Sequence, residues 1–240
     1  MTASIRQLAG CIGISGGFSI LSDFLGFWGG KLPSDPTGAQ VQISLVRQGR
    51  LLKGRYFNLN VIFIGSDNFT AADHDQIDYT IFKMRNIYNQ VNVGVGRVAY
   101  FGVSHADAGG LDAPTTQDQL SDIGHRWAVQ GDGLDIAVPV AMNVASNGGM
   151  ILGLSPQPGP CTDKHAKGMN GSVVGLFGKE QTARSFSHEI GHNLGLGHEN
   201  SSPSNLMAQS SVASSIRDSV VLTAAQGNTI IGHCLMKQGC

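Results

Sequence analysis

The sequence predicts a mixed domain of the α/β (α+β) class, and three observations point to it. The chain has 240 residues, which is enough for one domain with a full hydrophobic core. Its apolar fraction of 41% is ordinary for a globular protein. Short apolar runs typical of strands alternate with longer segments of helical period. We therefore expect a twisted mixed sheet of about five strands, with a backing helix, a histidine-bearing helix and a C-terminal helix.

Five segments have the pattern of strands. Residues 41–46 alternate between apolar and polar side chains, as a half-buried strand does. Residues 134–144 form a strongly apolar run that we expect at the centre of the sheet, although Pro139 favours an edge position or a bulge. The other predicted strands are residues 59–64, 95–103 and 172–177.

The longest predicted helix spans residues 74–92. Asp73 precedes it as the N-cap, and Gln76 three residues later completes a capping-box pattern. Gly94 follows the last apolar position and is expected to end the helix. The apolar side chains that recur at helical spacing are expected to face the core, and they are Ile77, Ile81, Met84, Tyr88 and Val91.

The remaining helices are shorter. Thr116 and Gln119 form the cap of a helix that runs to about residue 129. Residues 222–233 have the period of a C-terminal helix. Between these helices, residues 146–171 form a long irregular segment with several glycines and prolines, and a loop of this length is usually functional or tied down.

A turn-rich segment at residues 33–38 predicts a boundary between two parts of the chain. Residues 1–38 are then an N-terminal extension, and residues 39–240 are the main domain. The extension is apolar and rich in glycine, so it is either a packed segment or the remnant of a targeting or pro-segment. Cys11 ends a lipobox-like string, which leaves a lipoprotein as an alternative, although the stretch before it is short for a signal peptide.

Composition limits the classes of partner. The formal net charge of −1 gives no electrostatic reason to expect nucleic acid or an anionic membrane surface. No apolar run reaches the length of about 18–20 residues that spans a bilayer. Charged residues make up only 14% of the chain, which also has 33 glycines, and this combination favours a loop-rich protein that is secreted or otherwise exported.

Four cysteines are an even number and permit two disulfides. In one arrangement Cys234 pairs with Cys240 in a short C-terminal loop, and Cys11 pairs with Cys161 to tie the N-terminal segment to the body. The sequence alone allows three sets of pairs, and it also allows free thiols. No two cysteines form a CxxC pair, which argues against a second zinc site.

The string HEIGHNLGLGH, which begins at His188, predicts a catalytic zinc site. His188 and His192 are four residues apart, so a helix places them on the same face, one turn apart. Gly195 ends the helix and lets the chain turn, which returns His198 as a third nitrogen ligand. Three protein ligands leave the fourth position of a tetrahedral zinc ion open for water, as in catalytic zinc sites. Glu189 can reach that water.

This string resembles the signature of the metzincin metallopeptidases, HExxHxxGxxH followed by a methionine-containing turn. Every fixed position is filled, and Met207, nine residues after the third histidine, is the candidate turn methionine. The resemblance implies that residues 39–240 form a metzincin-like catalytic domain with the activity of a zinc metalloendopeptidase. It also implies that Met207 forms an apolar floor beneath the histidines without binding the ion.

The subfamily is not decided by these motifs. Glu199 after the third histidine resembles the astacin pattern, but Ala208 and Gln209 follow the turn methionine, where astacins and serralysins carry a tyrosine at the second position. The string HNLG resembles adamalysin-type peptidases. The outline of residues 152–197 is similar to pappalysin-type enzymes.

In metzincins the segment before the active-site helix borders the substrate cleft. By that resemblance, residues 150–155 are a candidate edge strand that would pair with an extended peptide, and a covering surface loop is the alternative. Residues 132–135 (Asp-Gly-Leu-Asp) hint only weakly at calcium, because such turns are common. The candidate cleft residues are Met150, Ile151, Leu152 and Gly153.

We therefore expect a zinc-dependent endopeptidase in which Glu189 removes a proton from the zinc-bound water as it attacks a peptide carbonyl. The expected zinc ligands are His188, His192 and His198, and the expected partner is a protein or peptide substrate. Two alternatives stay open, namely a non-catalytic metzincin-like binding module and a zinc hydrolase of a non-peptide amide. The sequence does not reveal the preferred substrate residues or the oligomeric state.

Overall fold

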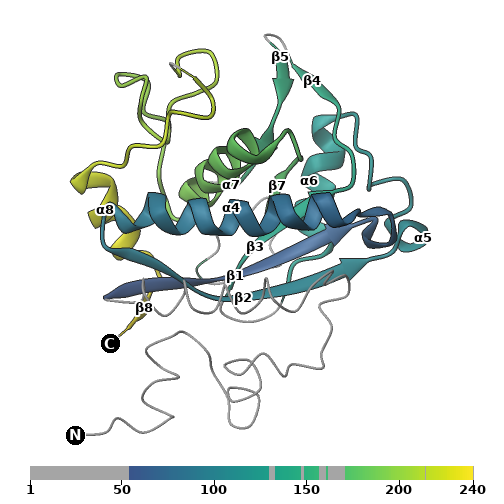
Figure 1. Cartoon of the computed structure of the whole chain (residues 1–240), viewed down its shortest axis with the longest axis horizontal. Coiled ribbons are helices and arrows are strands. Elements are labelled where there is room, and N and C mark those ends of the chain that lie inside the picture. The colour runs from purple at the N-terminus through teal and green to yellow at the C-terminus, as the bar shows by residue number, and fades with distance from the viewer. Residues whose placement is uncertain are drawn as a thin grey trace, which may run out of the picture.

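The computed structural model describes residues 54–129, 133–146, 149–156, 161, 171–213 and 215–239 (Figure 1). The predicted N-terminal extension, its boundary at residue 38 and the predicted strand at residues 41–46 lie outside these residues. Within the described part, helices cover both faces of one mixed sheet.

Five strands of this sheet follow one another in the order β2-β1-β3-β7-β6, and β8 also pairs with β1. The pairs β1–β2, β1–β3 and β3–β7 are parallel, whereas β6 runs antiparallel to β7 and β8 antiparallel to β1. The predicted mixed sheet is confirmed, and β6 forms one of its edges. The strand bounds are Arg55–Ile64 for β1, Val93–Val103 for β2, Gly133–Pro139 for β3, Gly153–Leu154 for β6, Ser172–Val174 for β7 and Lys237–Gln238 for β8.

Strand β3 lies at the centre of the sheet, between β1 and β7, as its apolar sequence predicts. Every residue of β3 is buried. The expected edge position or bulge at Pro139 is wrong, because Pro139 is the last residue of this central strand, and the predicted strand 134–144 ends there. The next N–H, that of Val140, donates to the Ile64 carbonyl at 3.1 Å, so pairing with β1 continues past the proline.

The two faces of the sheet carry different helices. Helices α4 (Ala71–Asn89) and α7 (Lys179–Asn193) pack on one face, and helix α6 (Gln117–Arg126) packs on the other. Connections between parallel strands are right-handed crossovers. Helix α4 connects β1 to β2 on one side of β1, and α6 connects β2 to β3 on the other side, so the two helices lie on opposite faces of the sheet. Side chains of β1 serve both cores by alternation: Phe57, Leu59, Val61 and Phe63 face α4 and α7, and Ile62 and Ile64 face α6.

The structure corrects both ends of the longest predicted helix. Thr70 is the N-cap of α4, because its side chain accepts from the Asp73 N–H while the Asp73 carboxylate accepts from the Thr70 N–H at 2.8 Å. Asp73 is therefore the acidic member of the capping box and not the cap itself. The helix ends at Asn89, and Asn92 adopts a left-handed conformation with φ 57° in the turn that follows. Gly94 lies inside β2.

The shorter elements agree better with the sequence. Helix α6 has the predicted capping box of Thr116 and Gln119, and helix α8 (Ala224–Ile231) falls within the predicted range. Strand β4 (Val144–Ser146) begins at the last residue of the predicted strand 134–144 and pairs with β5 (Gly149–Ile151), which lies in the predicted irregular segment. This hairpin projects from the body in Figure 1. Two short elements, η1 (Ser66–Asn68) and α5 (His105–Ala108), complete the described part. None of its helices has the length and hydrophobicity of a membrane span.

A disulfide joins Cys161 to Cys234. It links the segment before β7 to the turn after α8 across a sequence separation of 73 residues. The pairing of Cys234 with Cys240 and of Cys11 with Cys161 is therefore wrong, because the fold brings the end of α8 next to a loop that is distant in sequence. Cys11 and Cys240 lie outside the described residues.

We expect replacement of both Cys161 and Cys234 by serine to lower the free energy of unfolding by about 2–4 kcal/mol, because the closed loop restricts the unfolded chain. Urea denaturation of the variant and the unchanged protein measures the difference. With an excess of a dithiol reductant the two proteins should unfold at the same urea concentration. Equal midpoints without reductant would contradict the prediction.

Candidate metal centre and active site

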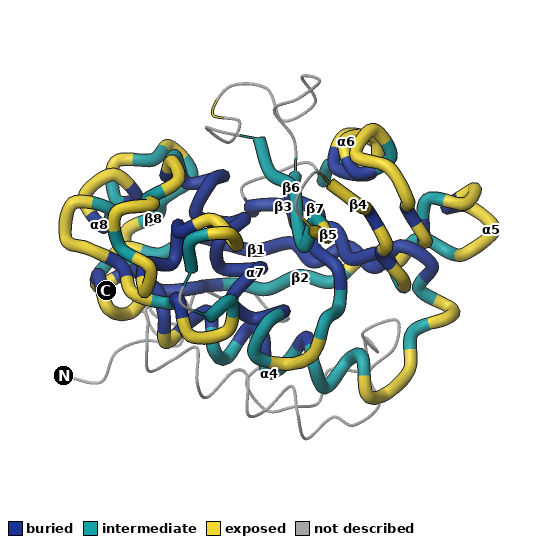
Figure 2. Tube along the Cα trace, turned by 90° about the horizontal axis from the view of Figure 1, so that it is seen from above, coloured by how far each residue is buried: buried dark blue, intermediate teal, exposed yellow. Residues whose placement is uncertain are grey.

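Helix α7 is a buried mount for the histidine string. His188 and His192 lie on the side of the helix opposite to its core contacts, and each is 6% exposed. Figure 2 shows α7 as a buried segment within the molecule. The side chains that anchor the helix are fully buried, as their spacing predicts, and they are Ala183, Phe186, Ile190 and Leu194.

The chain reverses at the end of α7, as the sequence predicts. Gly195 has φ 89°, a left-handed conformation that favours glycine. The Gly195 N–H donates to the His192 carbonyl at 2.8 Å, and the Leu196 N–H donates to the Gly191 carbonyl at 2.9 Å. These two bonds are those of a Schellman motif, which ends the helix and directs the following residues back toward it. His198 is thereby returned to the face that carries His188 and His192.

The three imidazoles meet through their Nε2 atoms. His192 Nε2 lies 3.1 Å from His188 Nε2 and 3.2 Å from His198 Nε2. The Nδ1 atom of His188 is 2.7 Å from the Leu206 carbonyl oxygen, and that of His192 is 2.8 Å from the Leu196 carbonyl oxygen. Because a carbonyl only accepts, each Nδ1 carries the proton and each Nε2 of a neutral ring presents a lone pair.

This arrangement fits a bound cation. Burial lowers the pKa of His188 to about 2 and that of His192 to about 4, and it also lowers the pKa of His198, so the rings are neutral near pH 7. Lone pairs facing one another at 3.1 Å repel unless a positive ion lies between them. Two nitrogens that each lie about 2.0–2.1 Å from a tetrahedral zinc ion are about 3.3 Å apart, close to the observed spacing.

Met207, the candidate turn methionine, is fully buried. It packs against the backbone of α7, because a Cβ atom built on Gly191 would lie 2.6 Å from the Met207 sulfur. The Met207 carbonyl accepts from the Glu199 N–H at 2.9 Å, next to the third histidine. The structure thus brings the turn methionine to the helix that carries the first two histidines.

Glu189 is 7% exposed and lies beside the edge strand β6. Burial raises the pKa of its carboxyl group to about 8, while a hydrogen bond with Ser155 and the positive charge of Arg184 act in the opposite direction. Gly153 of β6 makes this approach feasible. A Cβ atom on Gly153 would lie 2.7 Å from both Cγ and Oε1 of Glu189.

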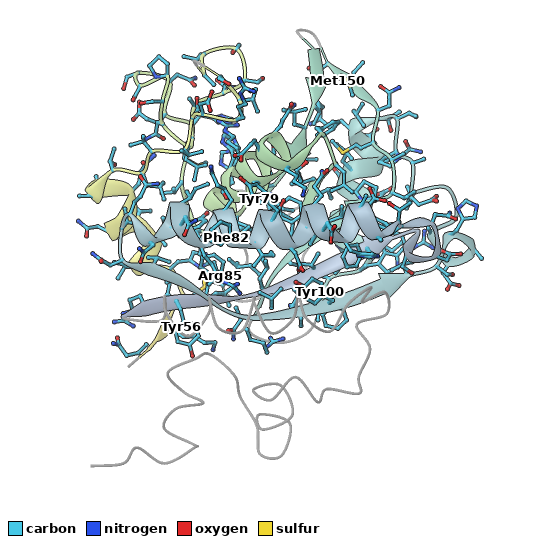
Figure 3. All side chains as sticks on the ribbon, viewed as in Figure 1. Tyr56, Tyr79, Phe82, Arg85, Tyr100 and Met150 are labelled. Atoms are coloured by element: carbon cyan, nitrogen blue, oxygen red, sulfur yellow. A yellow bond between two sulfur atoms is a disulfide. The ribbon has the colours of Figure 1, made fainter. Side chains whose placement is uncertain are left out.

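The predicted edge strand at residues 150–155 is divided in two. Gly153 is in β6 at the edge of the main sheet, next to Glu189. Met150 and Ile151 belong to β5 in the separate hairpin, where Met150 is 46% exposed (Figure 3). Leu152 lies between them, and its carbonyl accepts from the Gly175 N–H at 3.2 Å. The continuous strand is a wrong prediction because the chain leaves the hairpin at Leu152.

Comparison with known proteins then identifies the family. A family model described as Metallo-peptidase family M12 matches residues 62–238. The chain belongs to this family. It is a metzincin-like zinc peptidase, and membership of the M12 family implies a catalytic zinc ion and a protein or peptide substrate.

Solved structures that resemble the M12 peptidase include archaemetzincin from Methanopyrus kandleri, with 16% identity, a TM-score of 0.48, and coverage of 72% of this chain and 93% of the other. They also include metalloproteinase-II from Bacteroides fragilis, with 15% identity, a TM-score of 0.48, and coverage of 73% of this chain and 52% of the other. The search of curated proteins found no match.

Several polar residues that the sequence does not single out support the site of this M12 peptidase. The Ser155 hydroxyl donates to the Glu189 carbonyl oxygen at 2.8 Å and is also bonded to the Ser172 hydroxyl, which accepts from the Asn193 side-chain amide at 2.7 Å. These bonds tie β6 and β7 to α7. Arg184, one turn before His188, is also buried, at 4% exposed. The sequence carries no signal for this role, because Arg184 is flanked by Ala183 and Ser185 and its partners are backbone carbonyls.

Two further sets of residues do not fit a metal site. Cys161, His233 and Cys234 lie together, but their sulfurs are joined to each other, and His233 Nδ1 accepts from the Leu235 N–H at 3.3 Å. Asp135, in the segment that hints weakly at calcium, is turned inward. Its carboxylate oxygens accept from the Asn60 amide at 2.7 Å and the Val129 N–H at 2.8 Å. Asp132 lies outside the described residues.

We expect Gly153→Ala to lower kcat/KM for peptide hydrolysis by about 100-fold, because the added methyl group displaces the Glu189 carboxylate from its position. Zinc content should not change, since the three atoms nearest a Cβ on Gly153 all belong to Glu189 and not to a histidine. Gly232→Ala is the control, because its new Cβ atom would lie in ordinary contact with the Thr229 carbonyl oxygen, 3.5 Å away. Full activity of the Gly153 variant would show that β6 does not position Glu189.

Proposed function

We propose that this M12 peptidase is an endopeptidase in which His188, His192 and His198 hold the zinc ion and Glu189 is the general base. The observation that carries the proposal is the convergence of three imidazole Nε2 atoms, with neighbouring atoms 3.1 and 3.2 Å apart, beside the helix that carries Glu189. A zinc ion held there supplies Lewis acidity, which polarises a peptide carbonyl and lowers the pKa of water to near 7.

The protein's own groups then have separate tasks. Burial raises the pKa of Glu189, and the positive charge of a bound zinc ion would lower that pKa again and favour the ionised carboxylate. The carboxylate takes a proton from the attacking water and passes it to the nitrogen of the departing amine. Its burial against Gly153 restricts its side chain and keeps bulk water away from one side of the carboxyl group. The Leu196 and Leu206 carbonyls keep the Nδ1 protons of His192 and His188 in place, so those rings cannot present a proton to the site.

The position of β6 supports cleavage within a chain. β6 is an edge strand of the main sheet and lies beside Glu189. An extended peptide can pair with an edge strand and continue on both sides of the reactive group, whereas an exopeptidase needs a group that recognises a chain end.

The Cys161–Cys234 disulfide supports an exported location, because disulfides persist in oxidising compartments.

The direct test uses a mixture of peptides blocked at both ends, with products identified by mass spectrometry. We expect internal cleavage that stops when a chelator removes zinc and returns when zinc is added. Cleavage that requires a free terminus would exclude an endopeptidase. Zinc binding without cleavage of any peptide would favour a non-catalytic metzincin-like binding module. Hydrolysis confined to small non-peptide amides would favour a zinc hydrolase of a non-peptide amide.

We expect Glu189→Gln to reduce kcat by about 100- to 10,000-fold, because the amide has nearly the same shape but cannot accept the proton of water. Zinc content, measured by atomic emission, should remain at the level of the unchanged protein. His192→Ala is the contrasting variant, since it removes a predicted ligand and should lose zinc as well as activity. If Glu189→Gln cleaves peptides at the original rate, the proposed role of Glu189 is wrong.

A further inference from the structure

Arg184 is a buried cation on α7 that neither the family signature nor the proposed reaction requires. It lies four residues before His188, so the two side chains leave the helix on the same side, one turn apart. Only 4% of the residue is exposed. Burying a guanidinium is costly unless its donors are satisfied, so the groups that satisfy them are informative.

The acceptors of Arg184 are backbone carbonyls of the chain that follows the third histidine. Its Nη2 atom donates to the Leu206 carbonyl at 2.8 Å and to the Ala208 carbonyl. Its Nε atom donates to the Ser219 carbonyl at 3.3 Å. Leu206 and Ala208 are the neighbours of Met207, so one guanidinium holds both sides of the methionine turn.

The Leu206 carbonyl is also the acceptor for His188 Nδ1, at 2.7 Å. Arg184 and His188 therefore share one oxygen atom, and a carbonyl oxygen has two lone pairs with which to accept both. If that oxygen moves, the ring of His188 loses the bond that fixes its orientation and its tautomer. The same turn carries the Met207 carbonyl, which accepts from the Glu199 N–H at 2.9 Å, beside His198.

We propose that Arg184 is a positioning residue of the metal centre, acting through the Leu206 and Ala208 carbonyls to orient His188 and to hold the turn beneath the three histidines. The inference rests on the proposed function, because it assumes that these histidines hold the ion. The hydrogen bonds of the Arg184 guanidinium go to these backbone carbonyls and not to a histidine ring. Its planar fork directs several donors at once, whereas a lysine ammonium is a single point of charge.

The test compares Arg184→Met and Arg184→Lys with Arg85→Met. Arg85 is a matched control, because it is an equally buried arginine, 1% exposed, on the neighbouring helix α4 (Figure 3). The measurements are the zinc dissociation constant by competition with a chromophoric chelator, the visible spectrum of the cobalt-loaded protein, and the melting temperature.

We expect Arg184→Met to weaken zinc binding by about 10- to 100-fold, the range found when a group supporting a metal ligand is removed. The cobalt absorption bands, which report ligand geometry, should shift. Arg184→Lys should fall between this variant and the unchanged protein. Arg85→Met should lower the melting temperature without altering zinc affinity or the cobalt spectrum.

The proposal is overturned if the Arg184→Met variant melts at a lower temperature but binds zinc and cobalt as the unchanged protein does. An arginine with a purely structural role would behave in that way. If the Arg184→Met variant does not fold, the Arg184→Lys variant provides the test. An unchanged zinc affinity and an unchanged cobalt spectrum in the Arg184→Lys variant would also overturn the proposal. An unchanged protein that binds zinc but cleaves no peptide would refute the proposed function while leaving the positioning role measurable. If the unchanged protein binds neither ion, both proposals are wrong.

Discussion

Two backbone carbonyls, those of Leu196 and Leu206, set the chemistry of the site, because they hold the Nδ1 protons of His192 and His188. A histidine without such a bond can rotate or change tautomer and then presents a proton where a lone pair is needed. Both carbonyls belong to the chain that follows α7. The helix supplies the spacing of the first two rings, but the following turns decide which nitrogen each ring presents.

A second constraint is the close packing between the edge of the sheet and α7. Gly153 brings the backbone of β6 against the Glu189 side chain, and Ser155 donates to the Glu189 carbonyl oxygen. Ser172 and Asn193 extend the same network to β7 and to the end of α7. Strand, helix and carboxylate therefore form one packed unit, and the carboxylate does not depend on a surface loop for its position. This packing places a candidate peptide-binding edge beside Glu189, the proposed general base.

The site gathers several groups that are costly to bury. His188, His192, Glu189 and Arg184 are each less than 10% exposed within a few turns of one helix. Burial favours the neutral form of the imidazoles and of the carboxyl group, whereas the guanidinium keeps its charge with the help of carbonyl acceptors. The opposite, apolar side of α7 offsets part of this cost because it is fully buried in the core.

The sequence by itself determined the local features that depend on spacing and residue type. It predicted β3 as the central strand, the capping box of α6, the apolar side of α7 and the turn at Gly195, because residue type and spacing within one segment indicate each of them. It also predicted which three imidazoles would meet. The M12 family match agrees with the peptidase resemblance that this string carries.

Only the tertiary structure decided the contacts between segments distant in sequence. It paired Cys161 with Cys234, divided the expected edge strand at Leu152, and placed Pro139 at the end of a central strand. It also brought Arg184 to the carbonyls around Met207. Sequence patterns report the periodicity of one element, whereas these contacts depend on how the sheet, helices and loops pack together. When the partner of a side chain is a backbone carbonyl, the sequence carries no residue-type signal of the contact, because every residue has that carbonyl.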